Sequence, residues 1–199
     1  MLVVIEGIEG SGKSTLHKGL VERLSMEGRD VVVTREPGGT ATGDAIRSIF
    51  LDRTLTIEPL TETFLVNAAR AQHVAEVIRP ALAENRLVLC DRFTDSTLAY
   101  QGYGRGLDLA SLRRLCDEAT GGVTPDLVLL IDLPIEVART RMQARSYVLD
   151  RIESQDAAFH ERVRQGYLDL AKSPRHQVLD GTLPQDRLLE AAWNFISTS

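Results

Sequence analysis

The chain has 199 residues, which suits one good-sized domain, and its composition of 43% hydrophobic and 26% charged residues is ordinary for a globular protein. Its net charge of −5 argues against a broadly basic surface for DNA or RNA, so an anionic ligand has to be held by a local cluster of cations. No apolar run reaches the roughly 18 residues that a membrane helix needs, and the first residues do not resemble a signal peptide. We therefore expect a cytoplasmic protein with no nucleic-acid partner and no membrane partner. Its two cysteines, Cys90 and Cys116, fit no metal-binding spacing and suit a reducing compartment.

Short apolar runs alternate with helical patterns along the chain. The first half predicts a strand at 2–7, a helix at 13–27, a strand within 30–39 that runs into a Pro-Gly loop, a helix at 41–50, and a long helix at 59–84 with a candidate kink at Pro80. The second half predicts a strand at 86–92, helices at 95–102 and 108–119 separated by the glycine-rich GYGRG, a strand at 125–133, helices at 134–145 and 151–172, a strand at 176–181, and a helix at 184–197.

Short buried strands separated by helices are typical of a parallel sheet that is covered on both faces. We therefore predict one doubly wound α/β domain over residues 1–199, built on a five-stranded parallel sheet. In such sheets the ligand lies beyond the carboxyl ends of the strands. The residues at these predicted ends are Gly7, Arg35, Asp91, Arg92, Asp132 and Asp180.

The first predicted strand and helix are joined by a phosphate-binding pattern, G-x-x-x-x-G-K-[ST]. It comprises Gly7, Ile8, Glu9, Gly10, Ser11, Gly12, Lys13 and Ser14, and Thr15 follows it. Glycine allows the backbone N–H groups to turn inward around phosphate oxygens, and the N-terminus of the next helix favours negative charge. Lys13 would add a charge for the β and γ phosphates, and Ser14 would offer a hydroxyl to Mg²⁺. This pattern indicates a nucleoside triphosphate but does not separate kinases from GTPases or motor ATPases.

Several cations favour a second anion site, as a kinase with a phosphorylated acceptor requires. Arg35 follows the second strand, and Arg92 follows the third strand beside Asp91, which suits a role in holding Mg²⁺. Taken alone, a helical arginine such as Arg70 is more often a surface ion pair, and Arg139 and Arg141 fit a solvated helix face. No general base is needed, because a monophosphate oxygen is already anionic near neutral pH and catalysis reduces to alignment and charge neutralisation.

The motifs together resemble the thymidylate kinase family over essentially the whole chain. The resemblance is carried by GIEGSGKST, TREPGGT, AARAQH, DRFTDSTLAYQG, GLD, PDLVLLIDLP and LDRIE, which occur in the family's order. It implies a P-loop nucleoside monophosphate kinase fold with a mobile lid near 142–152. It also implies transfer of the γ-phosphoryl group of ATP to dTMP, with Mg²⁺, in dTTP synthesis, by a homodimer.

The resemblance also implies roles for individual residues. Residues 7–15 would cradle ATP, with Arg151 contributing from the lid, and 180–182 would lie near adenine. Ser14 and Asp91 would hold magnesium, and Lys13 and Arg92 would act in catalysis. The residues expected to contact dTMP are Glu9, Arg35, Pro37, Val66, Arg70, Arg92, Ser96, Thr97, Tyr100 and Gln101. Tyr100 would lie against the deoxyribose.

Two sequence features refine this expectation. The phosphate loop contains no basic residue before Lys13, which resembles the bacterial style of the family, with the catalytic arginine in the lid; Arg145 is the expected residue. Relatives often have an aromatic residue where this chain has Val66, so Phe64 or another side chain has to fill that space. Val66 is also the reason to keep a related kinase with a different acceptor base as an alternative. A non-catalytic nucleotide-binding module is disfavoured because Lys13, Ser14 and Asp91 are all present.

Overall fold

A computed structural model describes residues 1–144 and 149–197. The strands are β1 (Leu2–Glu6), β2 (Val31–Arg35), β3 (Leu87–Asp91), β4 (Leu127–Asp132) and β5 (His176–Asp180). All neighbouring strands are parallel, in the order β2-β3-β1-β4-β5. The predicted five-stranded parallel sheet is therefore confirmed, and β1, which precedes the phosphate loop, lies at its centre.

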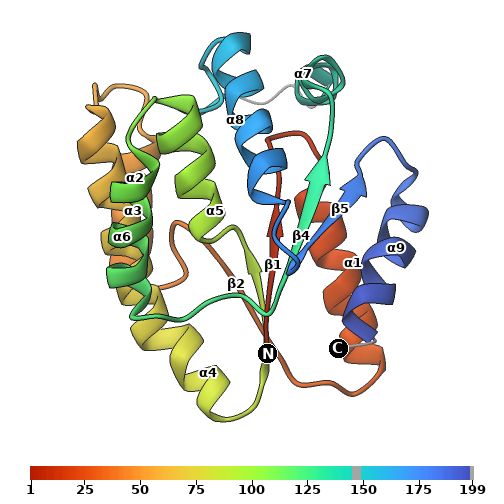
Figure 1. Ribbon diagram of the computed structural model, residues 1–199. Helices are drawn as coiled ribbons and strands as arrows, with labels where there is room; N and C mark the ends of the chain where they lie inside the picture. The colour runs from red at the N-terminus through yellow and green to blue at the C-terminus, as the bar shows by residue number, and fades with distance from the viewer. Residues whose placement is uncertain (145–148, 198–199) are drawn as a thin grey trace.

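The helices cover both faces of this sheet (Figure 1). They are α1 (Lys13–Met26), α2 (Ala41–Leu51), α3 (Pro59–His73), α4 (Arg79–Ala83), α5 (Thr94–Thr97), α6 (Leu109–Thr120), α7 (Ile135–Ala144), α8 (Ala157–Leu170) and α9 (Gln185–Ser197), with π-helical turns η1 (Val74–Ile78) and η2 (Leu98–Gly104). None of these helices has the length and apolar character needed to cross a membrane.

The core is divided by the sheet because strand side chains alternate between its faces. Val3 and Ile5 of β1 pack with Leu20 of α1 and with α9 on one face. Leu2 and Val4 of β1 pack on the other face with η1 and α4. Both faces of the central strands are therefore buried, as their unbroken apolar runs predicted. Figure 1 shows that all strands point toward the edge where α7 lies, while both termini lie at the opposite edge.

Two predicted boundaries were wrong. The helix expected from residue 151 begins at Ala157, because Asp150 accepts hydrogen bonds from the N–H groups of Ile152 and Glu153 and holds that stretch in a turn. Asp156 then caps the helix. The helix predicted to end at residue 102 continues through η2 to Gly104, so the first three residues of GYGRG are helical. The long helix predicted at 59–84 is observed from Pro59 to Ala83, and a π-helical turn directly precedes the expected irregularity at Pro80.

Candidate active site

The phosphate loop connects β1 to α1 across the carboxyl edge of the sheet. Gly10 and Gly12 have φ angles of +76° and +104°, which side-chain-bearing residues rarely adopt. A Cβ atom on Gly10 would also lie 2.7 Å from the backbone oxygen of Ala138 in α7. The loop therefore needs glycine for both its conformation and its close approach to α7, and α1 begins directly after it.

Lys13 is buried beneath this loop. Its Nζ donates hydrogen bonds to the backbone oxygens of Gly7 and Ile8, each at 2.9 Å. Burial, together with the positive charge of Arg92, lowers the pKa of Lys13 to about 8. A phosphate group bound in the loop would bring negative charge to this ammonium and favour its protonated form.

A groove runs from the phosphate loop along α1. It is lined by Gly10 and Thr15, by Arg141 of α7, and by Gly181 and Thr182, which follow β5. The segment expected near adenine therefore lies in the same groove as the phosphate loop. Arg141 lines this groove as well, so the sequence-based assignment of Arg141 to a merely solvated helix face was incomplete.

Ser14 and Asp91 line another hollow at the same edge, together with Arg35. The Asp91 Oδ1 atom is buried and has no hydrogen-bond partner among the described residues. Within residues 1–144 and 149–197, no group of three or more histidine, cysteine, aspartate or glutamate side chains is arranged to hold a metal ion. One free carboxylate oxygen beside one hydroxyl suits Mg²⁺, which is commonly held by one or two protein oxygens plus substrate phosphates and water.

A second cavity, which we call the acceptor cavity, lies on the other side of the phosphate loop and has an empty volume of about 590 Å³. Nine of the ten residues expected to contact dTMP line it: Glu9, Pro37, Val66, Arg70, Arg92, Ser96, Thr97, Tyr100 and Gln101. The sequence analysis missed other residues that line it: Glu36, Arg47, Phe50, Leu51, Phe93, Asp150 and Ile152. Residues distant in sequence thus converge on one site next to the phosphate loop.

Arg92 joins the acceptor cavity to the phosphate loop. It has a φ angle of +72°, and its guanidinium contacts Glu9 at 2.5 Å and the Tyr100 hydroxyl at 3.2 Å. Burial opposes ionisation of Glu9, but the charges of Arg92 and Lys13 outweigh it and lower the pKa of Glu9 to about 2. Glu9 is therefore a fixed negative charge between the two cations.

Arg70 is held rigidly at the base of the acceptor cavity. Only 2% of it is exposed, and it donates to Glu36 at 2.7 Å, to the Thr97 hydroxyl at 3.0 Å and to the Phe93 oxygen at 3.0 Å. Burial opposes its charge, but Glu36 more than compensates and raises the pKa of Arg70. The surface-ion-pair alternative for Arg70 is thereby excluded.

Two predicted arginines do not join this constellation. Arg35 is exposed, pairs with Asp44 at 3.2 Å, and lines the hollow of Ser14 and Asp91, not the acceptor cavity. Arg151, expected near ATP, instead donates to the Phe50 oxygen at 2.9 Å and to Glu62 at 2.7 Å. Arg145 lies outside the described residues.

The aromatic side chain beside Val66 in the acceptor cavity comes from α2, which the sequence analysis did not consider as a source of site residues. Phe50, at the end of α2, is 7% exposed and lines the cavity beside Val66. Phe64 of α3 does not line it and is 54% exposed. No local pattern distinguishes the two phenylalanines, because both follow helical spacing and only the packing of α2 on α3 decides which one points inward.

A phosphate loop and a separate cationic cavity at one edge of a five-stranded parallel sheet define a P-loop nucleoside monophosphate kinase. The family model of thymidylate kinase matches residues 5–191. The chain belongs to the thymidylate kinase family, the kinases that phosphorylate dTMP.

Individual relatives agree with this assignment. A thymidylate kinase of Deinococcus radiodurans is 49% identical over 199 residues, covering 99% of this chain and 96% of the relative. A thymidylate kinase of Desulfovibrio desulfuricans is 51% identical over 195 residues, covering 94% and 90%. The crystal structure of thymidylate kinase from Ehrlichia chaffeensis superposes with a TM-score of 0.79 at 33% identity, covering 98% of both chains. The predicted family and fold are confirmed.

Proposed function

We propose that this chain transfers the γ-phosphoryl group of ATP to dTMP, giving dTDP and ADP, within a single domain at 1–199 whose lid spans about 142–152. The observation that carries the proposal is the position of Arg92, whose guanidinium contacts both Glu9 of the phosphate loop and Tyr100 of the acceptor cavity. An acceptor phosphate bound by Arg92 would face the end of an ATP chain held in the loop. Two anions would then meet between fixed charges, which is the main requirement of phosphoryl transfer.

The roles of the chain's own residues follow from this arrangement. The glycine backbone and Lys13 would bind the triphosphate, and Arg92 would orient and partly neutralise the acceptor phosphate. Ser14 and Asp91 would hold Mg²⁺, which lowers the charge on the phosphates when bound. Arg70 with Glu36, and Thr97 with Gln101, would present polar groups to the base. Phosphate-bearing nucleotides are the partners of this site, and we assign Arg145 the catalytic role in the lid.

The assembly and location are also part of the proposal. Leu60 and Phe64 on α3 are 55% and 54% exposed, and such an apolar face suits contact with a second copy of the chain in a homodimer. Val74, which follows α3, is only 1% exposed and packs in the chain's own core, so it does not belong to this face. The two buried free cysteines suit the cytoplasm.

An acceptor-specificity assay tests the proposed reaction. Release of ADP from Mg²⁺-ATP would be measured with dTMP, dUMP, dGMP and dCMP as acceptors. We expect dTMP to give the highest kcat/KM, because Phe50 and Val66 offer apolar surface to the base and its methyl group while fixed polar groups line the rest of the acceptor cavity. A higher kcat/KM for another nucleotide would overturn dTMP as the acceptor, and no turnover with any of them would overturn the reaction.

A further inference from the structure

Glu6 is a buried carboxyl group that the proposed reaction does not use. It ends β1 directly before the phosphate loop, and its exposed fraction is 0%. It lies one hydrogen-bonded layer behind Arg92, the residue that would bind the acceptor phosphate. A buried carboxyl group at this position is costly unless its contacts serve a purpose.

Each Glu6 oxygen accepts hydrogen bonds from two donors. Oε1 accepts from the N–H groups of Phe93 at 2.8 Å and Ser96 at 3.2 Å. Oε2 accepts from the Ser96 hydroxyl at 2.7 Å and from the Tyr167 hydroxyl at 2.8 Å. Four donors pointing at two oxygens are the environment of an ionised carboxylate, because a protonated carboxyl would place its own hydrogen against one of them.

The same two hydroxyls also contact Arg92. Its Nη1 donates to the Ser96 oxygen at 3.0 Å and to the Tyr167 oxygen at 2.9 Å. Each hydroxyl has only one hydrogen, and when that hydrogen points to Glu6 the oxygen lone pairs remain free to accept from Arg92. The Ser96 and Tyr167 oxygens also lie 2.8 Å apart, so either hydroxyl could instead donate to the other. The negative charge on Glu6 favours the arrangement in which both hydrogens point to its Oε2 and both oxygens accept from Arg92. A proton on Glu6 would force one hydroxyl to accept from the carboxyl, and its hydrogen would then compete with Arg92 for the same space.

We propose that Glu6 is a positioning residue, which through Ser96 and Tyr167 holds the Arg92 guanidinium in place for the acceptor phosphate and loses this hold when it takes up a proton. The inference rests on the proposed function, in which Arg92 binds the acceptor phosphate. Glu6 itself touches neither nucleotide in this account.

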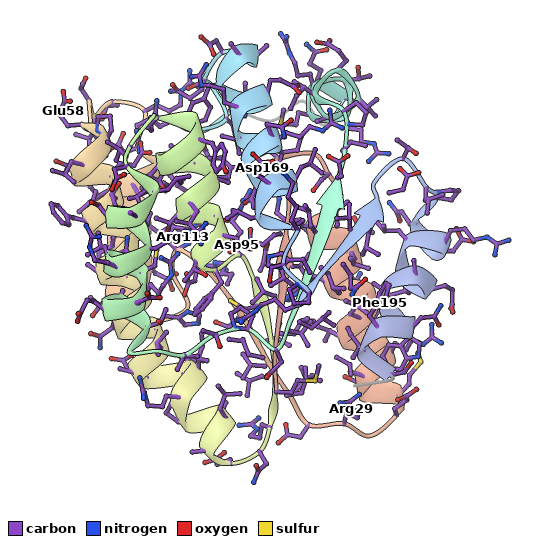
Figure 2. The ribbon with its side chains drawn as sticks, viewed as in Figure 1. Arg29, Glu58, Asp95, Arg113, Asp169 and Phe195 are labelled. Carbon is purple, nitrogen blue, oxygen red and sulfur yellow. The ribbon has the colours of Figure 1, made fainter. Side chains whose placement is uncertain are left out.

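Several charges surround Glu6 and determine when it ionises. Burial raises the pKa of Glu6 to about 7 against the opposing charge of Arg92, and the negative charge of Asp95 adds to the increase. Lys13 and Arg70 also face it and favour its ionised form. Asp95 itself contacts the His176 Nε2 at 2.6 Å (Asp95 is labelled in Figure 2). The proton on Glu6 is therefore exchanged near neutral pH.

The first test is Glu6→Gln, with kcat and KM for dTMP measured from about pH 5.5 to about pH 9. In the wild type we expect kcat/KM for dTMP to fall on the acid side with a midpoint near 7. In Glu6→Gln we expect about a tenfold lower kcat/KM at pH 8, mainly through a higher KM for dTMP, because an amide has one acceptor oxygen in place of two and its NH2 group would face one pair of the four donors. We also expect the midpoint near 7 to vanish, leaving only the lower titration of the substrate phosphate, whose pKa is about 6. KM for ATP should stay unchanged.

Asp95→Asn separates positioning from a purely structural role. Removing the Asp95 charge should move the acid midpoint to lower pH, because Glu6 then ionises more readily, whereas it cannot move the titration of the substrate. Asp169→Asn is the matched control, since Asp169 lies on α8 near Tyr167 but pairs with Lys172 and does not face Glu6. We expect its midpoint to equal that of the wild type.

The outcomes are distinguishable. An unchanged profile and KM in Glu6→Gln, or an unmoved midpoint in Asp95→Asn, would overturn the positioning role. If Glu6→Gln does not fold, Tyr167→Phe removes one of the two hydroxyls, and a KM for dTMP equal to that of the wild type would overturn it. A wild-type chain without turnover on dTMP would instead overturn the proposed function.

Discussion

At the scale of single residues, Phe50 is the aromatic side chain that lines the acceptor cavity beside Val66. Its ring also lies 5.2 Å from the Arg151 guanidinium, which limits its rotation. We expect Phe50→Leu to raise KM for dTMP about fivefold, since a ring against a nucleotide base contributes about 1 kcal/mol beyond its buried area. KM for ATP should not change. Steady-state kinetics with each substrate varied in turn measures both constants.

Phe64→Leu is the matched control for this prediction. It makes the same chemical change on α3, but Phe64 does not line the acceptor cavity. KM for dTMP should remain at the wild-type value. The reverse pattern, with an effect in Phe64→Leu and none in Phe50→Leu, would show that the ring against the base is not Phe50.

The residues whose positions in the fold could be predicted from local pattern are those that directly follow strands. The phosphate loop follows β1 and Arg92 follows β3, so their proximity followed from a parallel sheet, whereas Tyr100 was expected only from the family resemblance. Glu6 and Tyr167 were not predicted as site residues, because a glutamate before a loop and a tyrosine in a polar helix look solvated in sequence. Only the packing of α8 against η2 and α5 brings Tyr167 to Glu6.

At the scale of elements, Glu62 of α3 ties three segments together. It is fully buried and accepts hydrogen bonds from Gln101 of η2 at 2.7 Å, from Arg105 at 3.1 Å and from Arg151 at 2.7 Å. We expect Glu62→Gln to lower the free energy of unfolding by about 3 kcal/mol, because it leaves two partly buried arginines without their counter-charge. Urea unfolding measures this loss.

Glu58→Gln gives the comparison for Glu62. Glu58 precedes the same helix, is exposed, and makes no capping hydrogen bond with its side chain (labelled in Figure 2). The free energy of unfolding of the Glu58→Gln variant should differ from that of the wild type by less than about 0.5 kcal/mol. Equal effects in the two variants would mean that the Glu62 network contributes nothing beyond an ordinary surface charge.

Element type was predicted more reliably than element boundaries. Five apolar runs became the five strands: the central strands β1, β3 and β4 are buried on both faces, whereas the edge strands β2 and β5 are partly exposed. The start of α8 was placed too early because residues 151–156 have helical composition, and their turn depends on one side chain, Asp150. The end of η2 was placed too early because Gly102 and Gly104 resemble a loop. In the fold they allow close packing, and a Cβ on Gly104 would lie 2.7 Å from the Phe159 ring.

At the scale of the whole molecule, the strand order was not predictable from the apolar runs alone. The order β2-β3-β1-β4-β5 places β1 between β3 and β4, and it depends on which helices cover which face. This order is also what sets Glu6 in the interior, between the phosphate loop and Arg92. A charge at the centre of the sheet affects the stability of the entire domain, and its effect depends on pH.

The raised pKa of Glu6 determines whether its contribution to stability grows or falls as pH rises. Between pH 4.5 and about 7 the folded chain keeps a proton on Glu6 that the unfolded chain has released. The folded state therefore binds more protons in this window, and the Glu6 contribution to stability is fully present below pH 4.5 and lost as pH rises through 7. Glu9 has the opposite sign, since its lowered pKa gives stability that is present above pH 4.5 and lost as pH falls toward 2.

Glu6→Gln isolates the contribution of Glu6 to the pH dependence of stability. Glutamine has no proton to release, whereas Glu9 and Lys13 titrate in both proteins and their effects cancel in the comparison. Relative to wild type, we expect the free energy of unfolding of Glu6→Gln to increase by about 3 kcal/mol from about pH 4.5 to about pH 8.5. Urea unfolding at both pH values measures the difference, and Glu22→Gln, an exposed change on α1, should run parallel to wild type. Parallel curves for Glu6→Gln would mean that Glu6 has an ordinary pKa. A positive result would show that the chain keeps a charge behind Arg92 at a cost in stability, as expected if that charge serves acceptor binding and not folding.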